Sequence, residues 1–477
     1  MSDVGEHAVV LGAGIAGLLA ARVLSEFYKS VTVVERDRLP DHPRDRRGVP
    51  QGPHLHTFLS RGNQVLSELF PGVLEEMAGA GAVVVNDGDL SRIYARVGRC
   101  ELKRSGRLAD PAVLTLCLAT RPFVEFHVRR RVEALSNVAL LDEHEAIAPL
   151  VVAEAVTGVR IVDRDNGMVT GLDADLVVDT TGRAGRTRAF LDDLGYGRPA
   201  EKRSPSAVGY SSQRFEISNG CLNKQLVMAN QGPTEPTVLL VACEHDTWML
   251  AVGRSADAGG APADFSTMLA LTRKVLPRTI TDAMRDAQPL GEITMFRNPA
   301  AVWRRYDRMA RFPRGLLVMG DALCSLNPIH GQGMTMAALQ SLTLRDCLRR
   351  GDTDLARRFF HAAAHDIGLT WARNQASDRA PSPSGKPPVR QRLLGRIVRA
   401  TLTAAAYDIT VTERLLRVSH LVDPPSRLND PALLPHILAG NLRNLIAVSR
   451  SLLSRASINF DRGLAEVITD HKGQAHA

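Results

Sequence analysis

A glycine-rich turn close to the N-terminus constrains the fold of this chain more than any other feature. The motif Gly-x-Gly-x-x-Gly occupies residues 12–17, directly after the short apolar run 7–11. A stretch with helical spacing of apolar residues follows over 18–27, and the β-branched run 31–35 ends on Glu35. A strand, a glycine turn, a helix and a second strand ending on a carboxylate are typical of a dinucleotide-binding unit. The sequence therefore predicts an α/β protein that begins with a Rossmann-like domain.

The residue types in this turn predict how it binds a ligand. Glycines let the backbone approach a pyrophosphate closely, and the N–H groups at the start of the helix face its negative charge. Glu35 lies at about the distance along the chain that is expected for a carboxylate binding a ribose hydroxyl. This motif alone does not distinguish FAD from NAD. The candidate cofactor-binding residues of this unit are Gly12, Gly14, Ile15, Ala16, Gly17, Glu35 and Arg36.

A second motif, far along the chain, favours FAD over NAD as the cofactor. Gly320-Asp321 ends the apolar run 316–319, and Pro328-x-x-Gly331-x-Gly333 then opens a predicted helix that runs to about residue 349. Here the chain resembles the flavoprotein monooxygenases of the p-hydroxybenzoate hydroxylase type. The resemblance implies that Asp321 binds the ribityl chain of FAD and that a helix begins beneath the flavin ring, where backbone N–H groups stabilise negative charge. It adds Gly320, Asp321, Pro328, Gly331, Gly333 and Met334 to the cofactor-binding residues and places the backbone of Gly331, Gln332, Gly333 and Met334 near the ring, with no catalytic side chain identified.

Two further stretches narrow the resemblance to a subgroup of the family, and two positions depart from the family's pattern. The segment 46–56 and Thr120-Arg121-Pro122 resemble bacterial polyether epoxidases of the monensin and lasalocid type. Where the aromatic hydroxylases usually have Asp-Gly, this chain has Asp179-Thr-Thr-Gly182, so the docking mode of NAD(P)H stays open. Cys324 stands where those hydroxylases often have His. The resemblance adds Arg46, Gln51, Arg121, Asp179 and Gly182 to the cofactor-binding residues.

The remaining candidates for a chemical role are histidine and cysteine side chains, and each allows more than one interpretation. His54 and His56 fit a hydrogen-bonded structural pair better than a proton relay, and Cys324 fits an apolar filler better than a reactive thiol. The six cysteines form no CxxC pair, which argues against a metal site. Scattered cysteines in a chain of this length favour reduced thiols and a cytoplasmic location.

The order of the predicted elements suggests a two-part architecture with a helical tail. We expect a Rossmann-like FAD-binding domain, an inserted, mostly antiparallel β-sheet domain for the substrate, and a helical C-terminal region. A helix is predicted over 110–135. The expected boundaries are 1–75, 110–190 and 300–350 for the FAD-binding domain, 76–109 and 191–299 for the substrate domain, and 351–477 for the helical region, which includes a Pro/Ser-rich loop at 376–388.

Charge and hydropathy exclude several classes of protein. Fifty-nine basic and 51 acidic residues give a net charge of +8, a mild bias that does not argue for nucleic-acid binding. No run of 18 apolar residues exists, so no membrane span is expected, and acidic residues before the first apolar run argue against a signal peptide. Three arginine clusters are interpreted as solvated faces: Arg44/Arg46/Arg47, Arg129–Arg131 and Arg304/Arg305/Arg308.

The resemblance implies an FAD-dependent monooxygenase, an epoxidase or hydroxylase acting on a large apolar natural product such as a polyketide in antibiotic biosynthesis. NAD(P)H would reduce FAD, and a C4a-hydroperoxyflavin would deliver oxygen. A separate flavin reductase is an alternative source of electrons, and the substrate is either free or tethered to a carrier protein. A second hypothesis is an FAD-bound, non-redox cyclase that promotes a [4+2] cycloaddition in polyketide biosynthesis. A halogenase is less favoured, because the Trp-x-Trp-x-Ile type of motif is absent.

Overall fold

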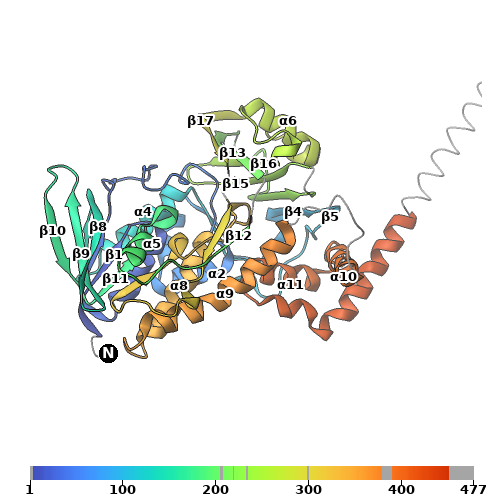
Figure 1. The fold of residues 1–477 in the computed structure, drawn as a ribbon. Helices are drawn as coiled ribbons and strands as arrows, with labels where there is room; N and C mark the ends of the chain where they lie inside the picture. The colour runs from blue at the N-terminus through green and yellow to red at the C-terminus, as the bar shows by residue number, and fades with distance from the viewer. Residues whose placement is uncertain are drawn as a thin grey trace, which may run out of the picture.

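Two large sheets form the framework of the chain (Figure 1). The computed structural model describes residues 4–204, 208–218, 220–232, 235–297, 300–378 and 389–450. The first sheet is parallel and has the strand order β19-β11-β1-β2-β7. Its strands are β1 (Gly5–Leu11), β2 (Tyr28–Val34), β7 (Val138–Leu141), β11 (Leu176–Asp179) and β19 (Leu316–Val318). These strands are short, apolar and largely buried, as expected for a sheet covered on both faces.

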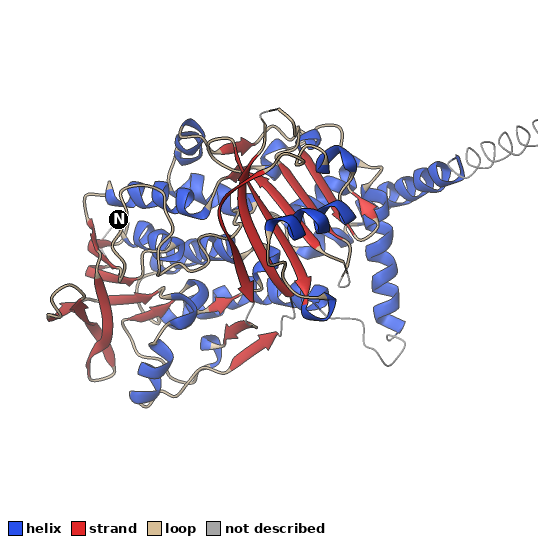
Figure 2. Cartoon of the chain, turned by 90° about the horizontal axis from the view of Figure 1, so that it is seen from above, coloured by secondary structure: helices blue, strands red, loops and turns tan. Residues whose placement is uncertain are grey.

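The second sheet lies beside the first and has seven strands in the order β17-β13-β16-β15-β14-β4-β5. Neighbouring strands are antiparallel except β14 and β4, which are parallel (Figure 2). Segments from two distant parts of the chain therefore share this sheet. Its strands are β4 (Ile93–Val97), β5 (Cys100–Glu101), β13 (Val208–Glu216), β14 (Leu226–Asn230), β15 (Thr237–Ala242), β16 (Thr247–Ser255) and β17 (Gln288–Arg297).

Helices on the parallel sheet position the two predicted cofactor motifs. Helix α1 (Ile15–Leu24) is almost entirely buried, because Ala, Leu and Val occupy nearly every face of it. It packs against α8 (Gly333–Leu348) and α4 (Arg121–Glu133). The other helices of this part are α2 (Ser60–Leu69), α3 (Val73–Gly79), α5 (Thr187–Asp193) and α9 (Leu355–Asp378), and α6 (Phe265–Val275) and α7 (Arg278–Thr281) accompany the second sheet.

Three small sheets complete the body. The hairpin tip between β15 and β16 joins the seven-stranded sheet to the start of α4, because Glu244 accepts hydrogen bonds from the backbone N–H and hydroxyl of Thr120, at 2.8 and 2.6 Å. The small sheets are β8 (His144–Val152), β9 (Ala155–Asp163) and β10 (Val169–Asp173); β12 (Glu201–Ser204), β18 (Ala301–Arg304) and β20 (Cys324–Ser325); and β3 (Val83–Val85) with β6 (Leu116–Leu118).

The C-terminal region is helical, with α10 (Val389–Ala405), α11 (Ile409–Ser419) and a helix over residues 434–450. Two sequence predictions were wrong in part. The helix expected over 110–135 begins only at Arg121, because residues 116–118 pair with β3 as a strand. The start of the loop expected at 376–388 belongs to α9, which continues to Asp378, and residues 379–388 lie outside the described residues.

The fold predicts a severe penalty for a side chain at Gly17. A Cβ built there would lie 1.8 Å from the carbonyl oxygen of Gly12, so α1 would have to move away from β1. We expect Gly17→Ala to lower the free energy of unfolding by about 3 kcal/mol in urea titrations. Gly79→Ala is the matched control, because a Cβ there meets nothing within 4 Å. Equal stabilities of the two variants would contradict the packing described here.

Candidate functional site

The glycine turn between β1 and α1 forms an open cradle. Gly12 has φ +98°, a conformation that favours glycine. A Cβ at Gly14 would meet only the guanidinium of Arg121, at 4.0 Å, and that position lies at the start of α1. The hydroxyl of Thr180 donates to the carbonyl oxygens of Leu11, at 2.7 Å, and Gly12, at 3.1 Å, and so holds the turn in place. The turn is thus shaped to let a ligand approach its backbone, and Arg121 is the cation that faces it.

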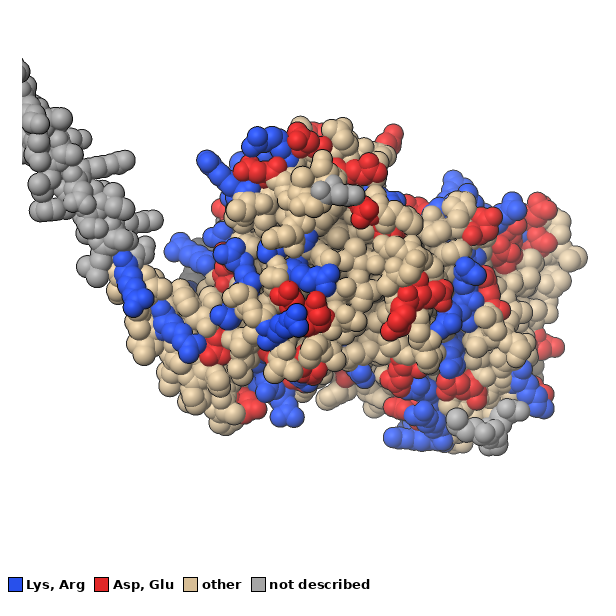
Figure 3. All heavy atoms as spheres, turned by 180° about the vertical axis from the view of Figure 1, so that it is seen from behind, with Lys and Arg blue, Asp and Glu red and all other residues tan. Residues whose placement is uncertain are grey.

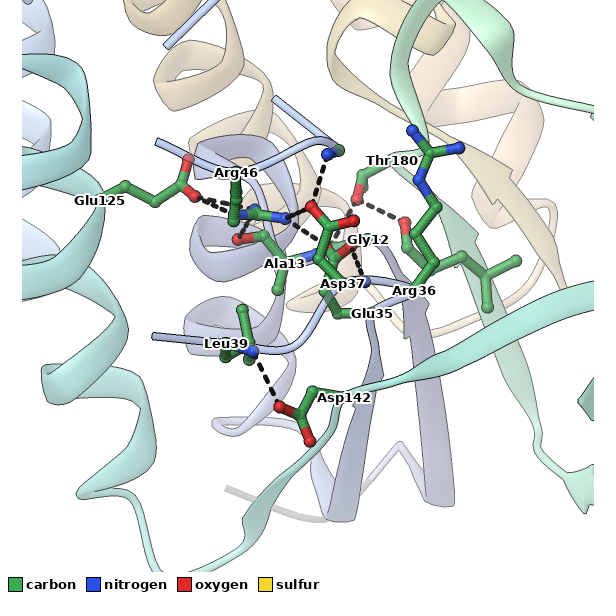
Figure 4. Close-up of polar contacts among 12 residues, drawn as sticks. Gly12, Ala13, Glu35, Arg36, Asp37, Leu39, Arg46, Glu125, Asp142 and Thr180 are labelled. Atoms are coloured by element: carbon green, nitrogen blue, oxygen red, sulfur yellow. Dashed lines mark hydrogen bonds and ion pairs between the residues drawn. The ribbon is translucent and has the colours of Figure 1, made fainter. Parts of the chain in front are cut away.

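Glu35 and Arg46 form a buried ionic cluster next to this turn (Figure 4). Glu35 accepts a hydrogen bond from the N–H of Ala13, at 2.8 Å, and pairs with Arg46 at 3.0 Å. Arg46 also binds Glu125, at 2.8 Å, and the carbonyl oxygen of Ala13, at 3.0 Å. Burial disfavours the charged guanidinium, but Glu125 and Glu35 outweigh that effect and raise the pKa of Arg46. The cluster fixes the Glu35 carboxylate beside the cradle.

The loop after β2 carries the other predicted residues of this part. Asp37 pairs with Arg46 at 3.4 Å and accepts a hydrogen bond from the N–H of Gly48, so the loop folds back over the cluster. The side chain of Arg36 is exposed, and its carbonyl oxygen accepts a hydrogen bond from Arg164 at 2.9 Å. Gln51 lies in the same loop, partly buried. Arg46 is therefore part of the cluster, while the ligand contacts predicted for Arg36 and Gln51 stay predictions.

The structure brings the second predicted motif directly against the first. Gly320 has φ +63°, and a Cβ there would lie 2.7 Å from the Cβ of Ala16, in the first turn of α1. The N–H of Gly320 donates to the side-chain oxygen of Gln340 at 2.7 Å, which links the loop to α8. Asp321, directly after Gly320, therefore lies close to the glycine turn.

Three arginines surround Asp321. Burial raises the pKa of its carboxyl group, and the nearby charges of Arg183, Arg121 and Arg304 oppose that rise. Arg304 also binds the backbone of the loop, since its guanidinium donates to the carbonyl oxygens of Asp321, at 3.0 Å, and Ala322, at 2.8 Å. A third bond, of 3.0 Å, goes to the carbonyl oxygen of Arg183. Arg304 thus fixes the position of Asp321 without occupying its carboxylate.

The start of α8 also offers open space. Residues Pro328–His330 form a single 3₁₀ turn, and Gly331 follows with φ +62°. A Cβ at Gly331 or at Gly333 would meet nothing within 4 Å. The buried side chain of Gln332 accepts a hydrogen bond from Asn374 of α9 at 2.7 Å, and Met334 is buried. The hydrogen bond between Gln332 and Asn374 therefore anchors the start of α8 to α9, while Gly331 and Gly333 leave open space beside the backbone.

Asp179 is engaged within its own loop. Its carboxylate accepts hydrogen bonds from the N–H and hydroxyl of Thr181 and from the hydroxyl of Thr187. Gly182 begins the next 3₁₀ turn with φ +75°, and a Cβ there would meet no atom within 4 Å. Of the two threonines that distinguish this stretch from an Asp-Gly pair, Thr181 therefore holds the Asp179 carboxylate, while Thr180 holds the glycine turn. The ligand contacts of Asp179 and Gly182 stay predictions.

The two predicted histidines lie where the parallel-sheet part meets the seven-stranded sheet. His54 is within hydrogen-bonding distance of the Ser212 hydroxyl, at 3.0 Å, and its ring contacts the edges of Tyr210 and Phe296, with centroids 4.9 and 5.4 Å apart. Burial lowers the pKa of His54 to about 4. Burial, and then the charge of Arg121, lower the pKa of His56 to about 3. Both rings are therefore neutral near pH 7, and His54 is hydrogen-bonded and buried, as a structural histidine would be.

The interpretation of the arginine clusters as solvated faces was wrong for one or more members of each. The side chains of Arg46, Arg129, Arg304 and Arg305 are only 6–9% exposed. Each one binds carbonyl oxygens or carboxylates inside the protein, and Arg305 also lies 4.1 Å from the ring centroid of Trp303. Cys324 is buried, which raises the pKa of its thiol well above the usual value, as expected for an apolar filler.

Sequence reasoning missed four residues that position the site. Glu125 lies four residues after Arg121 in α4, a spacing typical of helical ion pairs that could have revealed it. Thr180 and Gln340 gave no such signal, because their partners are backbone groups far away in the sequence. Arg304 was noticed only as part of a charge cluster.

Comparisons with known proteins place the chain in a family. No protein-family profile matches it. Protein Rv3254 of Mycobacterium tuberculosis is 37% identical over 451 residues, which cover 92% of this chain and 94% of that protein. The chain belongs to the family of Protein Rv3254. A kynurenine 3-monooxygenase of Salinispora arenicola is 26% identical over 377 residues, with 72% of each chain covered.

Solved structures of the same fold include flavin-dependent enzymes. The flavin-dependent brominase Bmp2 matches with a TM-score of 0.62 and 13% identity over 87% of this chain and 93% of its own. PqsL, a probable FAD-dependent monooxygenase from Pseudomonas aeruginosa, matches with 0.57 and 16%, over 86% and 98%. The Diels-Alderase PyrE3 of pyrroindomycin biosynthesis matches with 0.57 and 16%, over 88% and 81%. The chain therefore shares the fold of these enzymes, and it is similar in sequence to a kynurenine 3-monooxygenase.

Two searches of the described residues were negative. In the described part of the chain, no group of three or more His, Cys, Asp or Glu side chains is arranged to hold a metal ion. Within the same residues, no helix combines the length and the apolar character needed to cross a membrane.

The buried histidine predicts a stability that depends on pH. The unfolded chain binds a proton at His54 near pH 6.5, whereas the folded protein binds it only near pH 4, so acid favours unfolding in this window. We expect the free energy of unfolding to fall as the pH drops from 6.5 to 4, with His54 contributing up to about 3 kcal/mol. His54→Gln should remove this part of the slope, while Ser212→Ala, which keeps the histidine, should retain it. Parallel curves for wild type and His54→Gln would contradict the assignment.

Proposed function

We propose that the chain is an FAD-dependent monooxygenase, an epoxidase or hydroxylase that acts on a large apolar natural product such as a polyketide. One observation carries the proposal. The Gly320-Asp321 loop packs on the first turn of α1, so two cofactor motifs that are distant in sequence form one site. The similarity to a kynurenine 3-monooxygenase and the fold shared with PqsL support the same conclusion.

The residues present fit FAD. The open cradle at Gly14 and the start of α1 would hold the pyrophosphate, with Arg121 as its counter-charge. Glu35 would bind the adenosine ribose, since Ala13 and Arg46 orient its carboxylate without using all of its acceptor positions. Asp321 would take the ribityl chain. The unfilled space at Gly331 and Gly333 suits a planar ring lying against the start of α8.

FAD bound there would supply the activation of O₂ and the transfer of one oxygen atom to an electron-rich alkene or ring. The chain's own residues supply position and polarity. Backbone N–H groups at Gly333 and Met334 would stabilise negative charge next to α8 without a titrating side chain. His54 and His56 stay neutral at the boundary of the two sheets, so they add no charge to the region where an apolar substrate would lie. We place the substrate at this boundary, against Tyr210 and Phe296.

Several finer points belong to the same proposal. The sequence contains one strong dinucleotide turn, so NAD(P)H would reduce the cofactor as a transient visitor, and a separate flavin reductase is the alternative source of electrons. The segment 46–56 supports a polyether-epoxidase type of chemistry in antibiotic biosynthesis. The net charge of +8 would suit a substrate tethered to an acidic carrier protein. Six free cysteines fit a reduced, cytoplasmic environment.

A second candidate is an FAD-bound, non-redox cyclase that promotes a [4+2] cycloaddition. The fold shared with the Diels-Alderase PyrE3 supports this candidate. The Asp179 loop departs from the Asp-Gly pair, and the Asp179 carboxylate binds Thr181 and Thr187. This departure favours the cyclase. Here the protein would fold a flexible polyene into a reactive conformation. Halogenation is less favoured although brominase Bmp2 shares the fold, because the three tryptophans, at 248, 303 and 371, form no Trp-x-Trp pair.

The cradle predicts a variant that folds but does not bind flavin. Gly14→Val should leave the free energy of unfolding nearly unchanged, because the new Cβ meets only the end of the Arg121 side chain. Its methyl groups would occupy the space of the pyrophosphate at a cost of roughly 1–3 kcal/mol, so the Kd for FAD should rise by about 5- to 160-fold. Fluorescence titration of apoprotein with FAD measures this, and Gly79→Val is the control. Unchanged FAD affinity in Gly14→Val would remove the basis of the proposed site.

Turnover distinguishes the two chemistries. With a linear polyene substrate, a monooxygenase should consume NAD(P)H and O₂ and stop under anaerobic conditions. A cyclase should form product without NAD(P)H and without O₂, as long as FAD is bound. Product mass settles the outcome, because oxygen transfer adds one oxygen atom and cyclisation adds none. Sustained anaerobic turnover without a reductant would overturn the monooxygenase proposal in favour of the cyclase.

A further inference from the structure

Exposed apolar side chains gather on two helices of the C-terminal region. We call α10 together with the helix over 434–450 the C-terminal arm. Of the 15 large apolar side chains that are exposed among the described residues, nine belong to this arm, each of them 45–63% exposed. They are Leu393, Ile397, Val398, Leu434, Leu438, Leu442, Leu445, Ile446 and Val448. Such a concentration marks a surface that another apolar surface covers.

The spacing of these side chains produces continuous stripes. On the last helix, Leu434, Leu438, Leu442 and Leu445 follow one another at intervals of four, four and three residues, which places them along one face. On α10, Leu393 and Ile397 are four residues apart. Each helix is therefore amphipathic, with its apolar face turned to solvent.

The charges of the arm are all of one sign. Residues 389–405 and 434–450 contain no Asp or Glu, and their arginines include the exposed Arg392, Arg396, Arg399 and Arg450. Figure 3 shows Lys and Arg side chains along the outer part of the arm, whereas basic and acidic side chains are intermingled over the body. The acidic residues at the base of the arm are already paired, as Asp408 is with Arg443 and His436. The arm therefore presents leucines and positive charge together.

The two helices of the arm pack against each other where they cross. Gly440 lies so close to α10 that a Cβ there would come within 2.7 Å of the Cα of Ala404. Asn441 donates to the carbonyl oxygen of Ala400 at 2.9 Å. Figure 2 shows the last helix running outward from the body beyond this crossing. The exposed stripe of this helix extends on both sides of the crossing, and the described part of the protein leaves it exposed.

We propose that the C-terminal arm docks on the surface of an anionic lipid bilayer. An interfacial helix buries an apolar stripe at the level of the headgroups while arginines bind the negative phosphates, and both features occur here. The arm would lie on the bilayer, because no helix among the described residues is suited to cross it.

Charge complementarity favours this occupant over a second copy of the chain. Two arms packed face to face would bring arginine against arginine with no acidic residue on either helix to pair with them. Anionic headgroups supply the missing negative charge, and acyl chains supply the apolar partner for the leucines. A lipid surface thus provides partners for both the arginines and the apolar side chains of the arm.

Flotation of the full-length, FAD-loaded protein with lipid vesicles tests the proposal. Vesicles of phosphatidylcholine with about 30% phosphatidylglycerol should carry at least roughly tenfold more protein than phosphatidylcholine alone, and about 0.5 M NaCl should reduce binding. Two triple variants should each lose binding by roughly tenfold or more: Leu438→Gln/Leu442→Gln/Leu445→Gln and Arg392→Glu/Arg396→Glu/Arg399→Glu. All six positions are exposed, so circular dichroism and flavin content should match wild type.

A matched control removes as many exposed apolar side chains elsewhere. Val152→Gln/Met168→Gln/Val169→Gln changes residues of, or next to, the β8–β10 sheet that are 51–65% exposed, and it should bind vesicles like wild type. Protein that stays in solution with every vesicle would overturn the proposal, as would equal binding to neutral and anionic lipid. Light scattering that shows a dimer in wild type and a monomer in the leucine variant would identify a second copy as the occupant instead, which also overturns it.

Discussion

The close packing of the Gly320 loop on the first turn of α1 is the contact on which the site depends. Gly320 can approach Ala16 only because it lacks a side chain, and its positive φ turns the chain so that Asp321 follows at the cradle. Gln340 and Thr180 hold the two sides of this contact through hydrogen bonds to backbone groups. If the contact opened, two cofactor motifs would remain in the sequence, but no single site would exist for one ligand.

Buried arginines maintain that arrangement. Arg304 binds three carbonyl oxygens around the Asp321 loop, and Arg46 joins Glu35, Glu125 and the backbone of the glycine turn. A buried charge is tolerated only when it is paired and hydrogen-bonded, so each arginine fixes the loops that supply its partners. The resulting site consists of backbone groups and permanent charges, with neutral histidines at its edge. That composition suits an enzyme in which the cofactor carries out the reaction, while the protein positions the reacting groups and shields them from water.

Local patterns predicted the elements well and their boundaries less well. The strand before the glycine turn, α1 and α8 lie where apolar periodicity and glycine placed them, because each is specified by residues close together in the chain. The helix expected over 110–135 was wrong at its start, since pairing with β3 makes residues 116–118 a strand. The same limitation affected the arginines. Their sequence neighbours resemble a solvated cluster, while the carbonyl oxygens that bury Arg304 come from loops far along the chain.

The sequence by itself determined the class of the fold and where the two predicted cofactor motifs lie along the chain, because spacing and residue type are local properties. Only the tertiary structure decided that the two motifs meet, that Arg304 and Gln340 support them, and that Asp179 binds its own threonines. It also decided that the leucine stripes of the C-terminal arm face outward. An amphipathic pattern specifies that a helix has an apolar face, but which surface covers that face depends on packing between distant parts of the chain.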